Sequence, residues 1–230
     1  YPTKRVYYKP VTMSTLQGKL HKKIEQDTLT KEELKMIKGK YEVEDSDNEN
    51  ENNNKKKPPS NINKYLAATR KISNSVNNTP SVKVLKMLEK VKMANKPVVV
   101  YSNFISFGVQ MFKNLLDDNG ITNRLFTGST SAADKKTIIA DYNNRQFDVL
   151  CLSRSGSEGL DLKRTQEVHI MEPYWNNSQL EQVIGRAVRY KSHENLPKNK
   201  QHVNIYHWYS VYPRQMFSSK DISSDEYLIE

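Results

Sequence analysis

Hydrophobic positions after residue 80 fall into short β-branched runs separated by stretches of helical periodicity. The runs predict buried strands over residues 97–102, 123–128, 147–153, 167–172 and 203–208. Between them, apolar residues recur every three or four positions and predict helices near residues 81–92, 106–118, 131–143 and 177–190. Because parallel strands need crossover connections, this alternation predicts an α/β fold, with a parallel sheet flanked by helices on both faces.

The region before residue 64 has a different pattern. Leu16, Leu20 and Ile24 recur four apart, as on one helix face, and the spacing of Thr30 and Glu33 predicts a capping box for a second helix. Residues 41–63 are acidic and Asn-rich, then rich in lysine and proline, so a disordered insertion is predicted there. The predicted divisions are a helical lead-in (1–40), a flexible insertion (41–63), the α/β lobe (64–210) and a C-terminal tail (211–230).

Composition narrows the class of protein. Lys and Arg number 36 against 26 Asp and Glu, a net charge of +10 that suits a polyanionic partner, although a solvated basic surface explains the charge equally well. The one cysteine, Cys151, excludes a disulfide framework or a cysteine-rich zinc site within the chain and fits an intracellular setting. No apolar run has the length of a membrane helix. A start at Tyr1 rather than Met favours a fragment of a longer protein.

The most specific string in the chain is QVIGRAVRY. Its arginines, Arg186 and Arg189, are three residues apart and would occupy one helix face, where two guanidinium groups can converge on a phosphate. Gly185 would allow a close approach of backbone or ligand. Gln182, one turn earlier, could orient a guanidinium or a water. The alternative is a solvated helix with two surface arginines.

A second string, CLSRSGSEGLDL, leaves the predicted strand 147–153. Its two glycines and its hydroxyl residues make a tight loop whose N–H groups could face an anion, and Asp161 could accept hydrogen bonds from ribose hydroxyls. A simple turn is the alternative. Ser102 with Asn103, and Thr127 with Gly128, also end predicted strands, where ligands of parallel sheets bind. For the latter pair a plain helix N-cap is the alternative.

Taken in order, VVVYSNF, FDVLCLSRSGSEGLDL and HIMEPYWNNSQLEQVIGRAVR resemble the second RecA-like lobe of superfamily 2 helicases. The resemblance covers residues 80–210 and is greatest to the Swi/Snf-type group and to the nucleoside triphosphatases of poxviruses and related giant DNA viruses. The YWN before QxxGRxxR is typical of those groups. The resemblance implies a single RecA-like lobe from a nucleic-acid-dependent ATPase.

The resemblance also implies roles for individual residues. Arg186 and Arg189 match the motif arginines that approach the γ-phosphate of ATP held by another lobe, and Gln182 opens that motif. Asp161, where remodelling proteins tend to carry Asn, matches a position that meets the nucleotide ribose. The other implied nucleotide-binding residues are Glu158, Gly159 and Gly185. The implied nucleic-acid contacts are Ser102, Asn103, Thr127, Gly128, Ser153 and Arg154.

The sequence lacks two elements that ATP hydrolysis needs. No G-x-x-x-x-G-K-[ST] occurs, and Asp225-Glu226 lies in a polar tail instead of following a buried strand. ATP and Mg²⁺ are therefore expected to be held mainly by a first lobe outside this chain, and the chain alone is expected to be inactive. No metal site is expected within the chain itself.

The expected partners are that first lobe and DNA, with RNA an alternative polymer. The viral resemblance adds the transcription machinery as a candidate partner and the host cytoplasm or the virion as a location. A non-catalytic nucleic-acid-binding or docking module derived from a helicase lobe is the main alternative. An unrelated α/β transferase ranks last, because the G-x-G-x-x-G of a dinucleotide fold is missing after the first strand.

Overall fold

A six-stranded sheet forms the centre of the computed structural model, which describes residues 1–39, 60–154, 160–173 and 177–229. The strand order is β1-β8-β7-β4-β6-β5, and every neighbouring pair is parallel. The strands are β1 (Thr3–Thr12), β4 (Val98–Ser102), β5 (Asn123–Phe126), β6 (Val149–Ser153), β7 (Glu167–Ile170) and β8 (His202–Val211). The predicted parallel α/β fold is confirmed.

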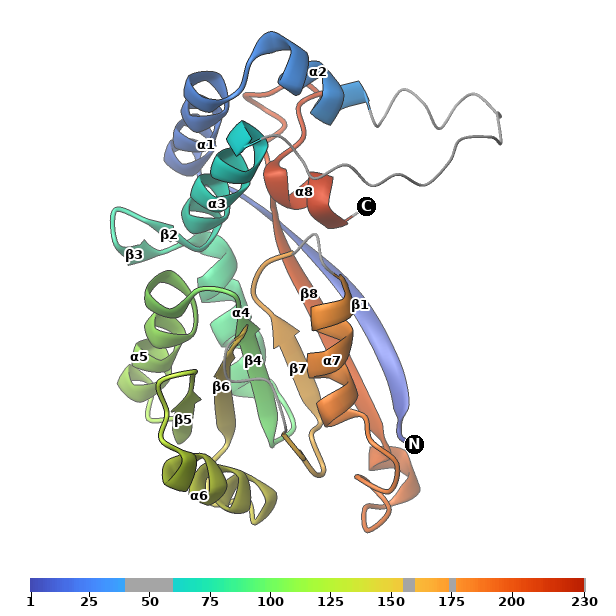
Figure 1. The fold of residues 1–230 in the computed structure, drawn as a ribbon. Helices are drawn as coiled ribbons and strands as arrows, with labels where there is room; N and C mark the ends of the chain where they lie inside the picture. The colour runs from blue at the N-terminus through green and yellow to red at the C-terminus, as the bar shows by residue number, and fades with distance from the viewer. Residues whose placement is uncertain (40–59, 155–159, 174–176, 230) are drawn as a thin grey trace, which may run out of the picture.

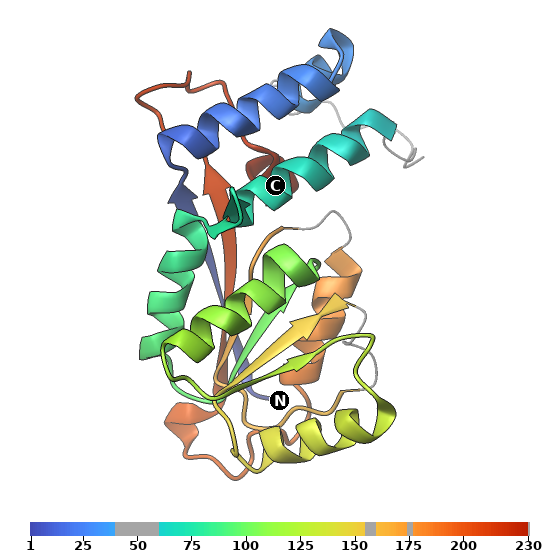
Figure 2. The ribbon, with the colours of Figure 1, turned by 90° about the vertical axis from the view of Figure 1, so that its left-hand side faces the viewer.

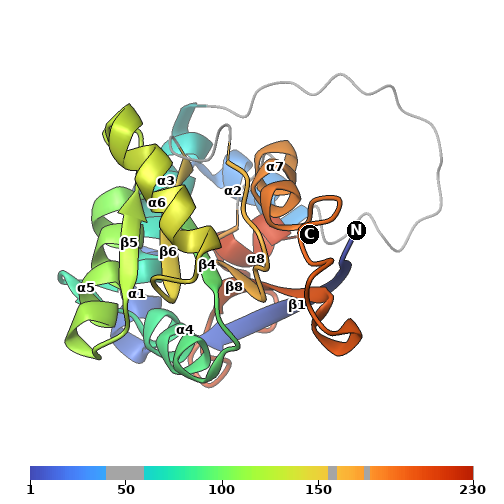
Figure 3. The ribbon, with the colours of Figure 1, turned by 90° about the horizontal axis from the view of Figure 1, so that it is seen from below.

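Helices cover both faces of this sheet (Figure 3). On one face lie α4 (Val82–Met93) and α5 (Gln110–Asp118), and on the other lie α6 (Ala132–Asn143) and α7 (Asn177–Ala187). Alternate residues of β4 supply the two cores, since Val98 and Val100 pack with α4 and α5 whereas Val99 packs with α7. Burial on both sides explains why these strands read as continuous apolar runs in the sequence.

A third layer of helices lies beyond the carboxyl ends of the strands (Figures 1 and 2). It contains α1 (Thr15–Thr28), α2 (Lys31–Gly39), α3 (Ser60–Asn74) and α8 (Ser224–Ile229). A separate apolar core holds it together, formed by Ile37, Ile62, Tyr65, Leu66 and Ile222. We call these four helices the helical layer. A hairpin of β2 (Ser75–Val76) and β3 (Thr79–Pro80) joins α3 to α4.

The predicted elements of the lobe are confirmed in type and nearly in length. Ser81 and Ser131 cap α4 and α6 by accepting hydrogen bonds from the N–H groups of Val84 and Asp134. The helix predicted from residue 106 instead begins with an irregular π-helical turn, η1 (Ile105–Val109), that precedes α5. A short 3₁₀ turn, η3 (Lys198–Lys200), leads into β8.

The N-terminal strand β1 was not predicted. It runs parallel to β8 along its whole length, from Thr3 opposite His202 to Thr12 opposite Val211, and forms one edge of the sheet. As an edge strand it is mostly exposed, and its apolar residues Val6, Tyr7 and Tyr8 are consecutive. The strand therefore lacks the alternation by which a half-buried strand is recognised.

The predicted apolar face of α1 is confirmed only in part, since Leu20 and Ile24 are half-buried and Ile24 packs against the core of the helical layer. Leu16 is 52% exposed, and the buried face consists of Gln17, Gly18, His21 and Glu25. Gln17 explains the difference, because its amide donates to the carbonyl of Ile72 in α3 at 2.9 Å. Helix α1 therefore packs on α3 through hydrogen bonds that apolar periodicity does not reveal.

The predicted boundaries on either side of the lobe also differ from the structure. The capping box of α2 is confirmed, with Thr30 and Glu33 exchanging bonds of 2.9 and 3.2 Å. Helix α3 begins at Ser60, inside the predicted insertion, and residues 40–59 lie outside the described part of the chain. Residues of the predicted tail are buried, Tyr212 among them. No helix among the described residues combines the length and apolar character needed to cross a bilayer.

Buried polar groups join the helical layer to the sheet. His21 of α1 lies between the hydroxyl of Tyr212, at 2.7 Å from Nδ1, and that of Ser224, at 3.0 Å from Nε2. Asp225 is buried as well, where it accepts from the N–H of Ser210 at 2.8 Å and pairs with Lys83 at 3.4 Å. Asp225, which does not match the acidic motif of ATP hydrolysis in the sequence, thus holds α8 against β8 and α4.

Protonation of His21 should lower the stability of the fold. Burial lowers the pKa of His21 from 6.5 to about 4, against a smaller opposing effect of Asp225. Below pH 6.5 the unfolded chain therefore binds a proton that the folded chain excludes until the pH approaches 4, so stability should fall over this window. At ~1.4 kcal/mol per pKa unit the loss is about 3 kcal/mol.

This prediction is checked by urea unfolding of the wild type and of His21→Gln between pH 7 and pH 4. The wild type should lose stability more steeply than the variant, because only the wild type carries the buried imidazole. Parallel curves for the two proteins would contradict the assignment.

Candidate functional site

The candidate nucleic-acid residues gather at one edge of the sheet. Asn103, Gly128 and Arg154 follow the carboxyl ends of β4, β5 and β6, and since these strands are parallel their ends meet at the edge that faces the helical layer (Figure 2). Gly128 and Arg154 are exposed and Asn103 is half-buried. The edge therefore presents a main-chain, an amide and a guanidinium donor from three adjacent strands.

The other three candidates are buried. Ser102, Thr127 and Ser153 are each less than 5% exposed. The Thr127 hydroxyl lies 2.9 Å from that of Ser129, and the Thr127 N–H donates to Thr130 at 3.0 Å. Thr127 thus shapes the turn before α6 from within.

Ser102 belongs to a network centred on Glu172, which sequence analysis did not identify as a candidate. Glu172 follows β7 and is fully buried. Its carboxylate accepts from the Ser102 hydroxyl at 2.9 Å and from the main-chain N–H of Asn103 at 2.6 Å. It also accepts from the amide of Asn74, in α3, at 2.9 Å. An acidic residue directly after a buried strand was the available signal in the sequence.

Gly108 makes room for this network. A Cβ atom at Gly108 would lie 2.2 Å from the Ser102 hydroxyl oxygen and 2.8 Å from the Ser102 Cβ. No side chain fits at these distances without moving Ser102 away from Glu172. The π-helical turn η1 is therefore packed directly against the end of β4.

The candidate catalytic residues lie at the C-terminal half of α7. One side of this helix is buried through Leu180, Val183, Ile184 and Ala187. The other side carries Gln182, which is exposed, and Arg186, which is half-buried. Helix α7 ends at Ala187, three residues before its predicted end, so Arg189 lies just beyond the helix.

Arg189 is paired with Asp161, which places two predicted site residues together. Their guanidinium and carboxylate lie 3.1 Å apart, and both side chains are about half exposed, at 45% and 55%. Asn143, the last residue of α6, fixes the backbone of this stretch by donating to the Asp161 carbonyl at 2.9 Å and accepting from the Lys163 N–H at 2.8 Å. An exposed pair of this kind contributes at most about 1 kcal/mol, so Arg189 can exchange Asp161 for another anion.

Gly185 is exposed and has no heavy atom within 4 Å of the position that a Cβ would occupy. Packing within the chain therefore does not require a glycine here. Glu158 and Gly159 lie outside the described residues.

Two arginines beside an open glycine fit a phosphate-bearing ligand, because guanidinium groups bind phosphate oxygens bidentately. The same residues do not supply the ligands that Mg²⁺ needs. Among the residues that the structure describes, no group of three or more His, Cys, Asp or Glu could hold a metal ion. No chemical step is therefore assigned to a metal held by these residues.

Comparison with protein families gives one match within this chain. Residues 81–191 match the family described as the helicase conserved C-terminal domain. This range contains β4 to β7 and α4 to α7, together with every candidate site residue. It leaves out β1, β8 and the helical layer.

Comparison with curated proteins gives viral relatives. A putative ATP-dependent RNA helicase of Acanthamoeba polyphaga mimivirus is 37% identical over 230 residues, which is 99% of this chain and 49% of that protein. A termination factor NPH-I homolog of an African swine fever virus isolate from Kenya is 27% identical over 200 residues, 64% of this chain and 28% of that protein. The chain thus spans half or less of the length of these relatives.

Solved structures share the fold. The C-terminal part of the Fun30 ATPase domain has a TM-score of 0.65 at 15% identity, and covers 92% of this chain and 86% of that one. The SWI2/SNF2 ATPase core of Sulfolobus solfataricus, in complex with dsDNA, has a TM-score of 0.61 at 15% identity over 91% of this chain and 42% of that one. Each structural match covers about nine tenths of the chain, a larger part than the family match over residues 81–191.

Two glycine substitutions should have opposite effects on stability. Gly108→Ala should lower the free energy of unfolding by about 2–3 kcal/mol, because its Cβ meets Ser102 in a packed interior. Gly185→Ala should raise it by about 0.5–1 kcal/mol, because alanine favours an exposed helical position with free space around it. Chemical denaturation of both variants checks this. A destabilised Gly185→Ala would show that Gly185 is required for packing within the chain.

Proposed function

Since residues 81–191 belong to the helicase conserved C-terminal domain family, we propose that this chain is the second motor lobe of a nucleic-acid-dependent ATPase. In this proposal the lobe supplies arginines to ATP bound by a first lobe and grips the backbone of the nucleic acid. The observation that carries the proposal is the position of Arg186, Arg189 and Asp161, exposed or half-exposed side chains next to the open Gly185.

Arg186 and Arg189 neutralise negative charge on the phosphates of ATP. Both guanidinium groups remain protonated at any physiological pH, and they stabilise the negative charge that develops on the transferred phosphoryl group. The Asp161 carboxylate pairs with Arg189 at 3.1 Å before the ligand arrives. Gln182, one helical turn before Arg186 on the exposed side of α7, orients a guanidinium or the attacking water.

Gly185 lets a ligand come close to α7 and is not needed for packing within the chain. Its missing side chain leaves space at the surface of α7, next to Arg186, for the nucleotide or the facing lobe. Stability and activity thus make opposite demands at this position, since alanine would improve the helix and narrow the space. Such a conflict is a frequent sign of a functional site.

The nucleic-acid grip is assigned to the carboxyl edge of the sheet. Asn103, Arg154 and the main chain at Gly128 reach phosphate oxygens there, without reading bases. Ser102, Thr127 and Ser153 act indirectly, since they are buried and shape the loops that carry these donors. Binding to phosphates suits a motor that must step along nucleic acid of any sequence. The net charge of +10 favours binding to a phosphate backbone.

The type of nucleic acid and the cellular process are proposed from the names of the relatives. The dsDNA in the Sulfolobus solfataricus complex supports DNA as the polymer, and the RNA helicase name of the mimivirus relative supports RNA. The termination-factor name of the African swine fever virus relative supports a role in viral transcription. The location proposed with this role is the host cytoplasm or the virion. We favour DNA, because the match to the complex that contains dsDNA covers 91% of this chain.

The proposal predicts that Arg186→Ala in the full-length protein lowers the rate of ATP hydrolysis by roughly 10³-fold at saturating ATP and nucleic acid, because an arginine finger contributes that much or more. Arg186→Lys should restore little, since an ammonium group lacks the planar fork. Steady-state phosphate release measures all three rates.

Arg5→Ala is the matched control, because Arg5 is an exposed arginine on the edge strand β1. This variant should hydrolyse ATP at the wild-type rate. An Arg186→Ala protein that keeps its full rate would overturn the assignment of the arginines. Absence of hydrolysis in the wild type, with nucleic-acid binding intact, would favour a docking module without ATPase activity.

A further inference from the structure

Three segments far apart in the sequence meet at the carboxylate of Glu172. Asn74 ends α3 in the helical layer, Asn103 begins the loop after β4, and Glu172 follows β7. Besides the bonds already described, the side-chain amide of Asn103 approaches Glu172 at 3.4 Å. One fully buried side chain thus connects the helical layer, the proposed phosphate-gripping loop and the strand that leads to α7.

The chemistry of this contact calls for a carboxylate. Glu172 receives hydrogen bonds from the Ser102 hydroxyl, the Asn103 main chain and the Asn74 amide, all of which are donors. A carboxylate is the side chain that accepts on both of its oxygens. Without it, buried donors would be left unpaired, which costs more than the bonds themselves contribute.

The path from Glu172 to α7 is short. The next residue, Pro173, is buried and lines one cavity together with Leu180 and Ile184 of α7. Met171, which precedes Glu172, is fixed to β4 because its main-chain N–H donates a hydrogen bond to the carbonyl of Tyr101 at 2.9 Å. Ile170 of β7 belongs to the same buried core as Leu180 and Ile184 of α7. A shift of Glu172 is therefore transmitted along β7 to the helix that carries Arg186.

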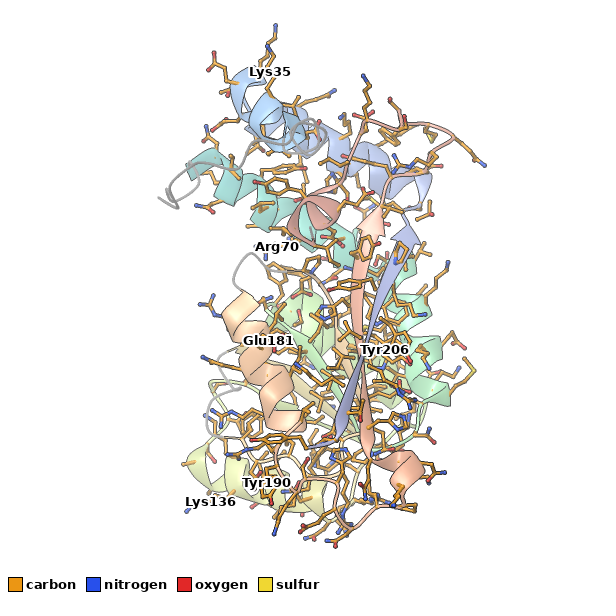
Figure 4. All side chains as sticks on the ribbon, turned by 90° about the vertical axis from the view of Figure 1, so that its right-hand side faces the viewer. Lys35, Arg70, Lys136, Glu181, Tyr190 and Tyr206 are labelled. Carbon is orange, nitrogen blue, oxygen red and sulfur yellow. The ribbon has the colours of Figure 1, made fainter. Side chains whose placement is uncertain are left out.

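The helical layer takes part from the other side. Arg70, one turn before Asn74 in α3, lies at the boundary between the layer and the sheet (Figure 4), with its guanidinium carbon 5.5 Å from the centre of the Phe104 ring. Lys71 lies 4.2 Å from the centre of the Phe107 ring. Helix α3 thus contacts both the loop that follows Asn103 and the carboxylate that holds it.

We propose that Glu172 is a positioning residue that fixes Asn103 relative to α7, so that contact of nucleic acid with the loop after β4 is coupled to the placement of Arg186. This inference rests on the proposed function and adds to it a residue that touches neither ATP nor nucleic acid. Glu172 acts on the coupling between the two ligands and leaves their separate binding sites in place.

The test compares Glu172→Met with Glu172→Gln in the full-length protein. Methionine has a similar length but accepts no hydrogen bond of useful strength, so Asn103 loses its anchor. Glutamine keeps one accepting oxygen, and its NH₂ can donate to Asn74, whose Oδ1 is buried without a hydrogen-bond partner among the described residues. The amide of Asn74 needs only to turn over for this bond to form.

The quantity measured is the ratio of ATP hydrolysis rates with and without saturating DNA. This ratio should fall about tenfold in Glu172→Met and stay within about threefold of the wild type in Glu172→Gln, in line with typical coupling energies. The KM for ATP and the affinity for DNA should change little in either variant. Equal ratios in Glu172→Met and the wild type would overturn the inference.

Glu167→Met is the matched structural control. Glu167 is a buried glutamate at the start of β7, the strand that Glu172 follows, and it forms a hydrogen bond with Nε2 of His169 at 3.0 Å. This variant should lose a comparable amount of thermal stability while keeping the wild-type stimulation ratio. If it loses stimulation as Glu172→Met does, the effect is one of general stability and the inference fails.

A second readout does not depend on ATP hydrolysis. Hydrogen–deuterium exchange without ligands should become faster in Glu172→Met at residues 103–109 and at residues 180–187 of α7 together, and Glu167→Met should leave both segments protected. Faster exchange in the first segment alone would overturn the proposed connection to α7. If the wild type shows no stimulation by nucleic acid, the proposed function fails, and exchange still decides whether Glu172 positions α7.

Discussion

The arrangement of the whole chain depends on a parallel sheet that is buried on both faces. Parallel strands require crossovers, the crossovers place α4 and α5 on one side and α6 and α7 on the other, and all strand ends then meet at a single edge. The candidate nucleic-acid residues lie at this edge, whereas Gln182, Gly185 and Arg186 lie on α7 and Arg189 pairs with Asp161 just beyond it. Because both faces are covered, that edge and the helix surfaces are where a ligand can reach the lobe.

Polar contacts at the same edge connect the lobe to the helical layer. Glu172, Asp225 and His21 are buried, and each joins residues that lie far apart in the sequence. Buried polar groups specify one arrangement more narrowly than apolar contacts do, because each misplaced donor or acceptor carries a cost. The helical layer is therefore attached to the sheet in a defined orientation, which a loop that must grip a backbone requires.

The elements that could be predicted from the sequence are those with a strong local signal. Strands β4 and β6 are buried at every position and mostly apolar, and Ser81 and Ser131 mark helix starts, so the order of the lobe followed from the pattern alone. Strand β1 gave no such signal, because an exposed edge strand has no buried face to alternate with. The α7 string was predicted as a site, although its helix ends before Arg189.

The role of Glu172 could not be predicted, because its partners come from α3 and β4 and meet only in the folded chain. The same is true of Gly108, whose neighbour Ser102 is close in sequence but whose steric constraint depends on the π-helical turn. Resemblance identified which loops matter. Only the fold distinguishes Asn103, which is partly accessible, from Ser102, which is buried and bonded to Glu172.

If this lobe belongs to a motor driven by ATP on nucleic acid, titration of the wild-type full-length protein with polymer should reveal it. ATP hydrolysis would be followed as single-stranded DNA, duplex DNA or RNA is added at saturating ATP. The rate should rise to a plateau with at least one polymer and should be highest with DNA. A rate that stays flat with all three, while binding to them is detected, would contradict it.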